Sequence, residues 1–416
     1  MRRNILILFL AGIFSNPLLL NAQDIQVKSL RVFSSSDQTS FPLIDISNPE
    51  KSSITIEFDV QSEYQPDFSI LFRFCDDNWN PVENTFLLNP IHNTEYNLWF
   101  DRLPLRIKGA KYHYSGNFPN ENVTFPFSGK WKFFVIDPQE PDHIYAEGKF
   151  YVVYPEVKLN TKITKVREEG ETSEIAILGR NITISTSFTL PDSLFPHYVK
   201  LVEVIVNKKI DYPIIVDRLT FNEERFYDWN GSSKFTFTAK EIRPGNEYRH
   251  TDFRDENIFN QPVINPQRVG IETSNLFKKG RRDFNGGSEL RNYKDDYAEY
   301  VDVNFKIRPP ENITSPVFLV GSFNDWQVFP QYEMFDDDGL LFLKLNLKRG
   351  AYDYQFVTGE VIDGKIVNID WNILEGNFWE TENDYHVFLF YETKEKGGYD
   401  KIIGYQKINS CEIWKH

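Results

Sequence analysis

The sequence predicts an all-β protein with two to three consecutive antiparallel β-sandwich domains after a signal peptide. Aromatic residues make up 16% of its 416 residues, and aromatic and β-branched side chains fit the pleated, half-buried surface of a sheet. Apolar and polar residues alternate with a period of two in many short segments, as in strands with one face in a core. Turn residues separate these segments, which is typical of sandwiches or barrels.

The N-terminus predicts a secretory signal peptide, residues 1–22. Arg2 and Arg3 precede an apolar run, and Ala22 precedes the expected cleavage site. The alternative is a membrane anchor, but the run is interrupted and short for a span of about 20 residues. Gln23 rather than a cysteine follows, so we expect no lipid anchor and a soluble, exported mature chain.

The first predicted domain covers residues 23–155. In the segment "ITIEFDV", residues 54–60, the four apolar residues share one face and the polar residues take the other. The segment "FYVVYPEVKLN" predicts a last strand that runs into a linker at Pro155. We therefore place the first domain boundary there.

The middle predicted domain covers residues 156–295. Alternating segments recur in "NITISTSFTL" (181–190) and "KFTFTA" (234–239). Residues 273–295 are polar, charged and glycine-bearing, which predicts a long loop at the end of this domain.

The C-terminal predicted domain covers residues 296–416. It contains the alternating segments "YVDVNFKI" (300–307) and "LFLKLNLK" (341–348). The turn signals between them include Asp338-Gly339, so we expect another antiparallel sandwich.

The long polar loop carries a basic cluster on an acidic chain. The cluster consists of Lys278, Lys279, Arg281 and Arg282, whereas the formal net charge of the chain is −14. It is either a solvated loop tip or a docking contact for an acidic partner. The acidic balance predicts no nucleic-acid partner, because binding to phosphate needs a basic stripe.

No motif in the sequence carries a recognisable chemistry. The seven histidines form neither a His-x-x-x-His pair nor a Cys/His metal grid. No serine lies in a Gly-x-Ser-x-Gly elbow, and no glycine-rich loop follows a strand to cradle phosphate. Residues 336–339, Asp-Asp-Asp-Gly, lack the spaced ligands of a calcium loop and predict a hairpin turn. We therefore expect no catalytic residue, no metal site, no cofactor and a non-enzymatic protein.

The two cysteines leave two alternatives. Cys75 and Cys411 could form one disulfide in an oxidising compartment, although two cysteines in so long a chain are no disulfide framework. The simpler interpretation is that Cys75, in "ILFRFCDDNW", is a buried strand residue.

The stretch "VFLVGSFNDWQ", residues 317–327, resembles the early-set, immunoglobulin-like β-sandwiches of the glycogen-binding kind. An apolar strand leads into a Gly-x-Phe-Asn-x-Trp loop, and a hairpin and a Gly-x-Tyr-x-Tyr strand follow. In such modules tryptophans and a lysine of that strand hold a sugar. Here Trp326 is kept, with Asn324 beside it, but Gln355 stands where the lysine would be.

This resemblance leaves two interpretations of the tryptophan. Trp326, Asn324 and Gln355 form a residual glycan platform, or Trp326 closes the end of the sandwich as a hydrophobic lid. Aromatic stacking by itself contributes only about 1 kcal/mol. We therefore expect an inherited frame without a working sugar site.

The mature chain as a whole resembles the type IX secretion system plug protein family of Bacteroidota. The motifs that carry the resemblance lie in all three predicted domains. They are "IEFDV" (56–60), "FRFCDDNWNP" (72–81), "YHYSGNFPNENVTFPFSGKWKFFVID" (112–137), "RPGNEYRHTDF" (243–253), "EGNFWETENDYHVFLFY" (375–391) and "YDKIIGYQKINS" (399–410).

The family resemblance implies a periplasmic, non-enzymatic protein held peripherally at the outer membrane. Its partner would be the giant outer-membrane β-barrel translocon, whose periplasmic mouth such a protein plugs. The alternative function is a periplasmic carbohydrate-binding β-sandwich protein. On the plug interpretation, the basic cluster at residues 278–282 is the candidate contact with the barrel.

Several motif residues have structural explanations. Gly245 and Asn246 suit positions with positive φ. Glu382 and Asn383 suit the start of a strand, where they satisfy backbone donors. Trp79 follows an acidic pair at a strand end, and we expect it to cap the edge of a core.

Overall fold

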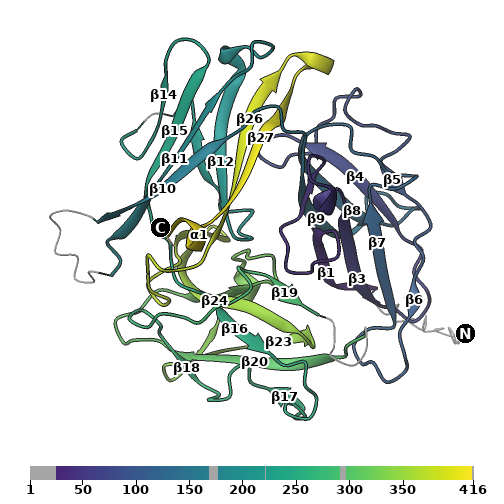
Figure 1. Ribbon diagram of the computed structural model, residues 1–416. Coiled ribbons are helices and arrows are strands. Elements are labelled where there is room, and N and C mark those ends of the chain that lie inside the picture. The colour runs from purple at the N-terminus through teal and green to yellow at the C-terminus, as the bar shows by residue number, and fades with distance from the viewer. Residues whose placement is uncertain (1–24, 168–176, 221, 291–296, 415–416) are drawn as a thin grey trace, which may run out of the picture.

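The computed structural model describes residues 25–167, 177–220, 222–290 and 297–414. The predicted signal peptide, residues 1–22, lies outside this part of the chain. The described residues form 27 strands in six sheets and one short helix, α1 (Ser410–Trp414). Single-turn 3-10 helices lie in the loops at η1 (Pro49–Lys51), η2 (Pro196–Tyr198), η3 (Pro330–Tyr332) and η4 (Glu395–Gly397). The sheets pack in pairs as three β-sandwiches (Figure 1), so the predicted all-β fold with several sandwiches is confirmed.

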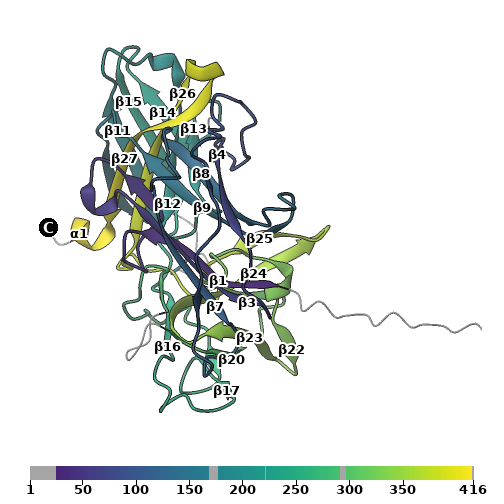
Figure 2. The same cartoon turned by 90° about the vertical axis from the view of Figure 1, so that its right-hand side faces the viewer.

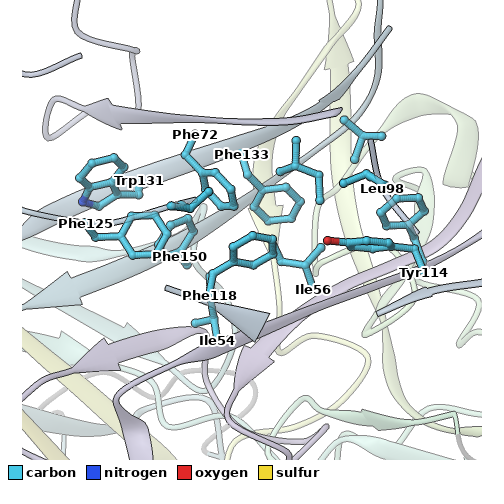
Figure 3. Packing of buried hydrophobic residues seen from close by; sticks show 14 of the residues in the cluster. Ile54, Ile56, Phe72, Leu98, Tyr114, Phe118, Phe125, Trp131, Phe133 and Phe150 are labelled. Carbon is cyan, nitrogen blue, oxygen red and sulfur yellow. The ribbon is translucent and has the colours of Figure 1, made fainter. Parts of the chain in front are cut away.

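The N-terminal sandwich pairs two sheets across a core of aromatic rings. The strand orders are β1-β3-β7-β6 and β2-β9-β8-β4-β5. The strands are β1 (Gln26–Ser34), β2 (Leu43–Asp45), β3 (Ile54–Gln61), β4 (Ser69–Cys75), β5 (Thr94–Glu95), β6 (Asp101–Arg102), β7 (Tyr112–Phe118), β8 (Gly129–Ile136) and β9 (Ile144–Val153). The ring of Phe125 meets those of Phe72, Trp131 and Phe150 edge to face (Figure 3). Such pairs contribute about 0.5–1.5 kcal/mol each beyond the burial of their area.

The middle sandwich has the strand orders β10-β11-β15-β14 and β13-β12-β26-β27. The strands are β10 (Asn160–Arg167), β11 (Arg180–Thr189), β12 (Val199–Val206), β13 (Ile214–Asp217), β14 (Arg225–Trp229), β15 (Lys234–Ile242), β26 (Asp384–Thr393) and β27 (Tyr399–Asn409). Its core includes Ile184 and Phe237 from one sheet and Val202 and Val387 from the other.

The third sandwich lies at the bottom of Figure 1. One sheet has the order β16-β24-β19 with β21 and β25 also paired to β24, and the other has the order β17-β20-β23-β22 with β18 paired to β20. The strands are β16 (Arg249–Asp252), β17 (Val263–Ile264), β18 (Glu272–Thr273), β19 (Ser288–Glu289), β20 (Tyr300–Arg308), β21 (Val317–Gly321), β22 (Phe335–Asp337), β23 (Leu340–Lys348), β24 (Ala351–Ile362) and β25 (Lys365–Asp370). The pairing is antiparallel except for short parallel bridges of β17 and β18 with β20, and of β2 with β9 in the N-terminal sandwich.

The three sandwiches do not follow one another along the chain. The strands β16 to β25 of the third sandwich come between β15 and β26, which both belong to the middle sandwich. The hairpin β26–β27 returns to the middle sandwich, where β26 pairs with β12 from Val199↔Tyr391 to Val206↔Tyr385. The third sandwich is thus inserted into the middle one, and strand pairing crosses the boundary predicted at residues 295 and 296.

The N-terminal and middle sandwiches share a second, smaller core. It packs the outer face of β9 against the outer face of β26, where the rings of Tyr151 and Phe388 stack with centroids 4.3 Å apart. Trp79 lies at the edge of this cluster and meets Tyr151 edge to face. Figure 2 shows the same arrangement from the side. Both faces of the N-terminal sheet β2-β9-β8-β4-β5 are therefore covered where β9 passes between the two sandwiches.

The strand β3 is also covered on both faces. The residues of the predicted apolar face, Ile54 and Ile56 among them, lie in the core of the N-terminal sandwich. Asp59 on the opposite face is 0% exposed, because the third sandwich packs against it through Tyr300 and Lys348.

Cys75 and Cys411 form no disulfide. Cys75 is buried at the end of β4, as the simpler sequence interpretation expects. Burial raises the pKa of its thiol to about 12, so at neutral pH it is protonated and behaves as a small apolar side chain.

Candidate functional site at the junction of the sandwiches

The Gly-x-Phe-Asn-x-Trp loop turns its tryptophan inward. The backbone N–H of Gly321 donates to Oδ1 of Asn324 over 3.0 Å, which closes the turn. Asp325 and Trp326 then adopt the left-handed conformation, with φ of 51° and 61°. This conformation is uncommon for residues other than glycine and is often found at functional sites.

The indole of Trp326 is covered by this chain itself and is only 1% exposed. Its Nε1 donates to the carbonyl oxygen of Gly286 over 2.9 Å. The ring of Tyr248 packs on it with centroids 4.2 Å apart. The indole is therefore covered by Tyr248, just before β16, and by Gly286, just before β19.

Lys209 of the middle sandwich lies among the residues of the predicted glycan platform. Its Nζ donates to Oε1 of Gln355 over 3.2 Å and lies 4.0 Å above the centre of the Trp371 ring. The rings of Tyr248 and Trp326 lie 5.2 Å and 5.6 Å from the same nitrogen. The structure therefore brings Trp326 and Gln355 together, but around a lysine of this chain.

Burial among these rings lowers the pKa of the Lys209 ammonium to about 7. The neighbouring amide of Gln355 also donates to the carbonyl oxygen of Trp371 over 3.0 Å. Both polar ends of Gln355 are thus used within the protein. Asn324, the third residue of the predicted platform, serves the turn of its own loop.

The motif residues around positions 245 and 377 join the two connections between the middle and third sandwiches. Oδ1 of Asn377 accepts from the backbone N–H of Gly245 over 2.9 Å, and its Nδ2 donates to the carbonyl oxygen of Arg180 over 2.7 Å. The side chain of Asn383 donates to the carbonyl oxygen of Pro244 and accepts from Asn207. Of the Gly245–Asn246 pair, only Gly245 has a positive φ, of 78°. The motif residues here thus form a hydrogen-bonded crossing of two connections.

The crossing is completed by a buried ionic cluster. Arg249 on β16 donates through Nε to Glu375 over 2.9 Å and through NH1 to Glu272 over 2.8 Å. Tyr354 donates to the other oxygen of Glu272 over 2.9 Å. A guanidinium between two carboxylates satisfies all three charges, as buried charges require.

Buried ion pairs also link the N-terminal sandwich to its two neighbours. Toward the middle sandwich, Lys130 Nζ lies 2.7 Å from Glu203, which also accepts from the hydroxyl of Tyr151 over 2.8 Å. Burial raises the pKa of the Glu203 carboxyl, while Lys130 opposes the shift.

Toward the third sandwich, Asp59 accepts from Lys348 over 2.7 Å and from the hydroxyl of Tyr300 over 2.9 Å. Nδ1 of His113 lies 2.7 Å from the same carboxylate. Burial acts to raise the pKa of Asp59, but Lys348 and His113 together hold it below its ordinary value. Breaking a buried pair by removing one partner typically costs about 3–5 kcal/mol, so these contacts favour one fixed arrangement.

The predicted basic cluster lies on the surface of the third sandwich. Lys278, Lys279, Arg281 and Arg282 are all exposed, and Arg282 has a loose contact of 3.9 Å with Glu382. The turn beneath them is held by Asn246, whose side chain donates to the carbonyl oxygen of Lys278 and accepts from the backbone of Gly280. The last residues of the predicted loop, 291–295, lie outside the described part of the chain.

Two carboxylates, Asp283 and Asp353, lie behind the basic cluster and influence each other through their charges. Asp353 accepts from the backbone N–H groups of Phe284 and Gly286 and from His250. Asp283 accepts from the backbone of Tyr248 and Asn285. Burial, together with the charge of Asp353, raises the pKa of Asp283 to about 8. The sequence carried no signal for this pair, because the two residues are far apart in the chain.

A cavity of about 380 Å³ lies where the three sandwiches meet. Its wall includes Leu30 and Phe133 of the N-terminal sandwich, Lys208 and Ile210 of the middle sandwich, and Asp325 of the tryptophan loop. The loop that resembles a sugar-binding motif therefore contributes to the junction between the three sandwiches.

The fold and this junction define the class of protein: three interlocked β-sandwiches that are held together by hydrogen bonds and ion pairs of the motif residues. Among the described residues, no group of three or more His, Cys, Asp or Glu side chains could hold a metal ion. No helix in the part of the chain that the structure describes is long and apolar enough to cross a membrane.

Comparison with known proteins assigns the N-terminal sandwich. Residues 27–154 match the family model of the type 9 secretion system plug protein, first domain. The resemblance to the plug family predicted from the motifs is confirmed for this part of the chain. The early-set likeness of residues 317–357 stays a prediction.

The fold as a whole has a counterpart among solved structures. A crystal structure of a hypothetical protein from Parabacteroides merdae ATCC 43184 is similar with a TM-score of 0.74, covering 92% of this chain and 97% of that chain. The two sequences are 18% identical, so the likeness concerns the fold. No curated protein matches the chain.

Proposed function

We propose that this protein is a plug subunit of the type IX protein secretion system. It would act in the periplasm, held peripherally at the outer membrane by the translocon barrel, and close the periplasmic mouth of that barrel. The observation that carries the proposal is the match of residues 27–154 to the first domain of the plug protein.

The packing of the three sandwiches supports this role physically. A plug must keep its shape against a pore, and a rigid body needs contacts that are costly to break. The Asp59–Lys348 and Lys130–Glu203 pairs each join two sandwiches and are almost fully buried. Removing one partner of such a pair leaves an uncompensated charge.

The basic cluster at residues 278–282 remains our candidate contact with the barrel. A plug must release when cargo arrives, so its contact should be modest and partly polar. Exposed rim charges mostly set the association rate and its salt dependence, whereas buried anchors set the residence time. Four exposed cations on a chain of net charge −14 suit that role.

The carbohydrate-binding alternative receives less support from the geometry. It requires the Trp326 ring to be accessible, and that ring is covered by Tyr248 and Gly286. Titration of the purified chain with maltooligosaccharides tests this alternative directly. Micromolar binding that is abolished by Trp326→Ala without a change in the melting temperature would favour it over the plug.

The plug proposal is tested by deleting the gene and by purifying a tagged chain from envelope membranes. We expect the tagged chain to recover a very large outer-membrane barrel. We expect the deletion strain to become permeable to large antibiotics that the outer membrane normally excludes. A tight envelope and normal secretion in that strain would contradict the proposal.

A further inference from the structure

The cavity at the junction of the three sandwiches is large enough for a small ligand. Its volume of about 380 Å³ falls in the usual range of small-molecule sites, about 300–1,000 Å³. Rings and aliphatic side chains cover much of its wall, among them Phe133, Ile210 and Phe329. Such walls favour a ligand with an apolar body.

Two charged side chains on the cavity wall have no partner within the protein. Among the described residues, neither Lys208 Nζ nor the Asp325 carboxylate has a hydrogen bond or an ion pair, whereas the nearby Lys149 and Asp211 pair with each other. Nε of Arg31, on the same wall, is buried and also lacks an acceptor. The cavity thus offers a cationic side with unused donors and an anionic side with unused acceptors.

Lys208, Asp325 and Arg31 all line this one cavity. Burial lowers the pKa of Lys208 to about 8, with Arg31 acting in the same direction and Asp325 against it. Asp325 is exposed and Lys208 is partly exposed, so both side chains are charged at pH 7 and a ligand would replace the water that solvates them.

We propose that this cavity binds a small zwitterion with an apolar body, of the size of an apolar amino acid or a dipeptide. The carboxylate of the ligand would pair with Lys208 on the side of Arg31, and its ammonium would pair with Asp325. The apolar body would lie against Phe133, Ile210 and Phe329. Because all three sandwiches contribute to the wall, the ligand would also stabilise their relative arrangement.

The backbone of the tryptophan loop is consistent with a site of this kind. Asp325 and Trp326 both hold a positive φ, and strained conformations of this kind cost about 1–3 kcal/mol each. The turn directs the indole of Trp326 into the protein, while the neighbouring Asp325 lines the cavity. Trp326 of this loop therefore belongs to the core, and Asp325 immediately before it lines the cavity.

Isothermal titration of the mature chain at pH 7 tests the proposal with matched probes. The probes are L-leucine and L-leucyl-L-leucine, N-acetyl-leucine, which lacks the ammonium, and leucine methyl ester, which lacks the carboxylate. A charged hydrogen-bonding contact contributes about 1.5–3 kcal/mol, so each blocked compound should bind about 10–100-fold more weakly than leucine.

Two variants assign the two contacts. In Asp325→Asn, which suits the left-handed backbone, leucine and N-acetyl-leucine should bind equally. In Lys208→Met, leucine and leucine methyl ester should bind equally. Lys158→Met, at an exposed position that does not line the cavity, should leave every affinity unchanged and serves as the control.

The outcomes separate clearly. The proposal is overturned if neither leucine nor the dipeptide binds at millimolar concentration, or if the blocked compounds bind as well as leucine. Preferential binding of glucose or maltose would also overturn it. Both variants could lose all binding simply because they are less stable, which a lower melting temperature would show. In that case the comparison of leucine with the blocked compounds on the unchanged chain decides the test, because it uses no variant.

Discussion

Trp326 shows at the scale of one residue why a loop motif does not by itself predict a binding site. The sequence predicted two uses for its ring, a glycan platform and a lid, and the alternation around it could not decide between them. Whether the ring is accessible depends on Lys209 and Tyr248, which come from distant segments of the chain and lie against it. Such contacts leave no local pattern, so the sequence predicts the loop but not its cover.

Replacing Trp326 by alanine should strongly destabilise the fold. The change removes a buried indole and its hydrogen bond to Gly286, and truncation of a buried aromatic ring typically costs about 3–5 kcal/mol. The matched control is Trp99→Ala, because Trp99 is 83% exposed and should change the free energy of unfolding by less than about 0.5 kcal/mol. Urea unfolding measures both, and equal losses would mean that the indole is not a core residue in solution.

Asp283 should give the stability a distinctive pH dependence. Its pKa rises from an ordinary 3.8 to about 8 on folding, so between these values the folded state holds a proton that the unfolded state has lost. This term therefore makes the folded state less stable as the pH rises from about 4 to about 8, and it levels off above that. In Asp283→Asn the term is absent, so the stability of the variant relative to the parent should increase across the same range.

Urea unfolding at several pH values checks this difference, and Asp337→Asn, at the exposed end of β22, is the control. A difference between Asp283→Asn and the parent that stays constant from pH 4 to pH 8 would show that Asp283 titrates normally in the folded protein.

At the scale of elements, the sequence identified strands well and their partners poorly. Period-2 alternation predicts that residues 54–60 form a strand, and β3 occupies Ile54–Gln61. The same pattern says nothing about which strand lies beside it, because alternation marks a buried face and not the neighbour that buries it. For this reason the return of β26 and β27 to the middle sandwich could not be predicted, and neither could the second covered face of β3.

The insertion predicts an unusual effect of truncation. A chain ending at residue 380 lacks β26 and β27, which form half of one sheet of the middle sandwich. We expect such a chain to lose the cooperative unfolding of the middle sandwich, because Val202 and Val204 would lose the strand that covers them. A chain lacking only residues 415–416 is the control.

Limited proteolysis followed by mass spectrometry reports the outcome of the truncation. Rapid cleavage between residues 156 and 242 is expected in the shortened chain. Protection of this segment, with damage confined to residues after 296, would instead indicate three independent consecutive domains.

Two lysines on the strand β23 allow the contribution of a buried ion pair to be compared with that of an exposed one. Lys348→Met leaves Asp59 without its ammonium partner and should cost about 3 kcal/mol or more. Lys344→Met, on the same strand, removes an exposed contact with Asp302 and should cost less than about 1 kcal/mol. Comparable denaturation midpoints for the two variants would show that the link between the N-terminal and third sandwiches contributes little.

At the scale of the whole molecule, charge should tune the proposed docking. Changing Lys278, Lys279, Arg281 and Arg282 together to glutamate reverses four exposed charges without touching a core. We expect the complex with the barrel to be recovered less efficiently and to dissociate at lower salt concentration, because exposed contacts are screened by salt. Affinity purification across a salt series measures this effect, and the same change at four exposed lysines or arginines elsewhere is the control. An unchanged complex would leave the proposed plug role standing and show that another surface makes the contact.

The insertion also has a mechanical consequence. A domain at the end of a chain can rotate about its single connection. The third sandwich instead has two connecting segments to the middle sandwich, near residues 243–248 and 371–383. These two connections are cross-bonded through Asn377 and Asn383. A torque on the third sandwich would therefore be transmitted to the middle one instead of being absorbed by a hinge. If such a body closes a pore, a pull at one corner should dislodge it as a single piece.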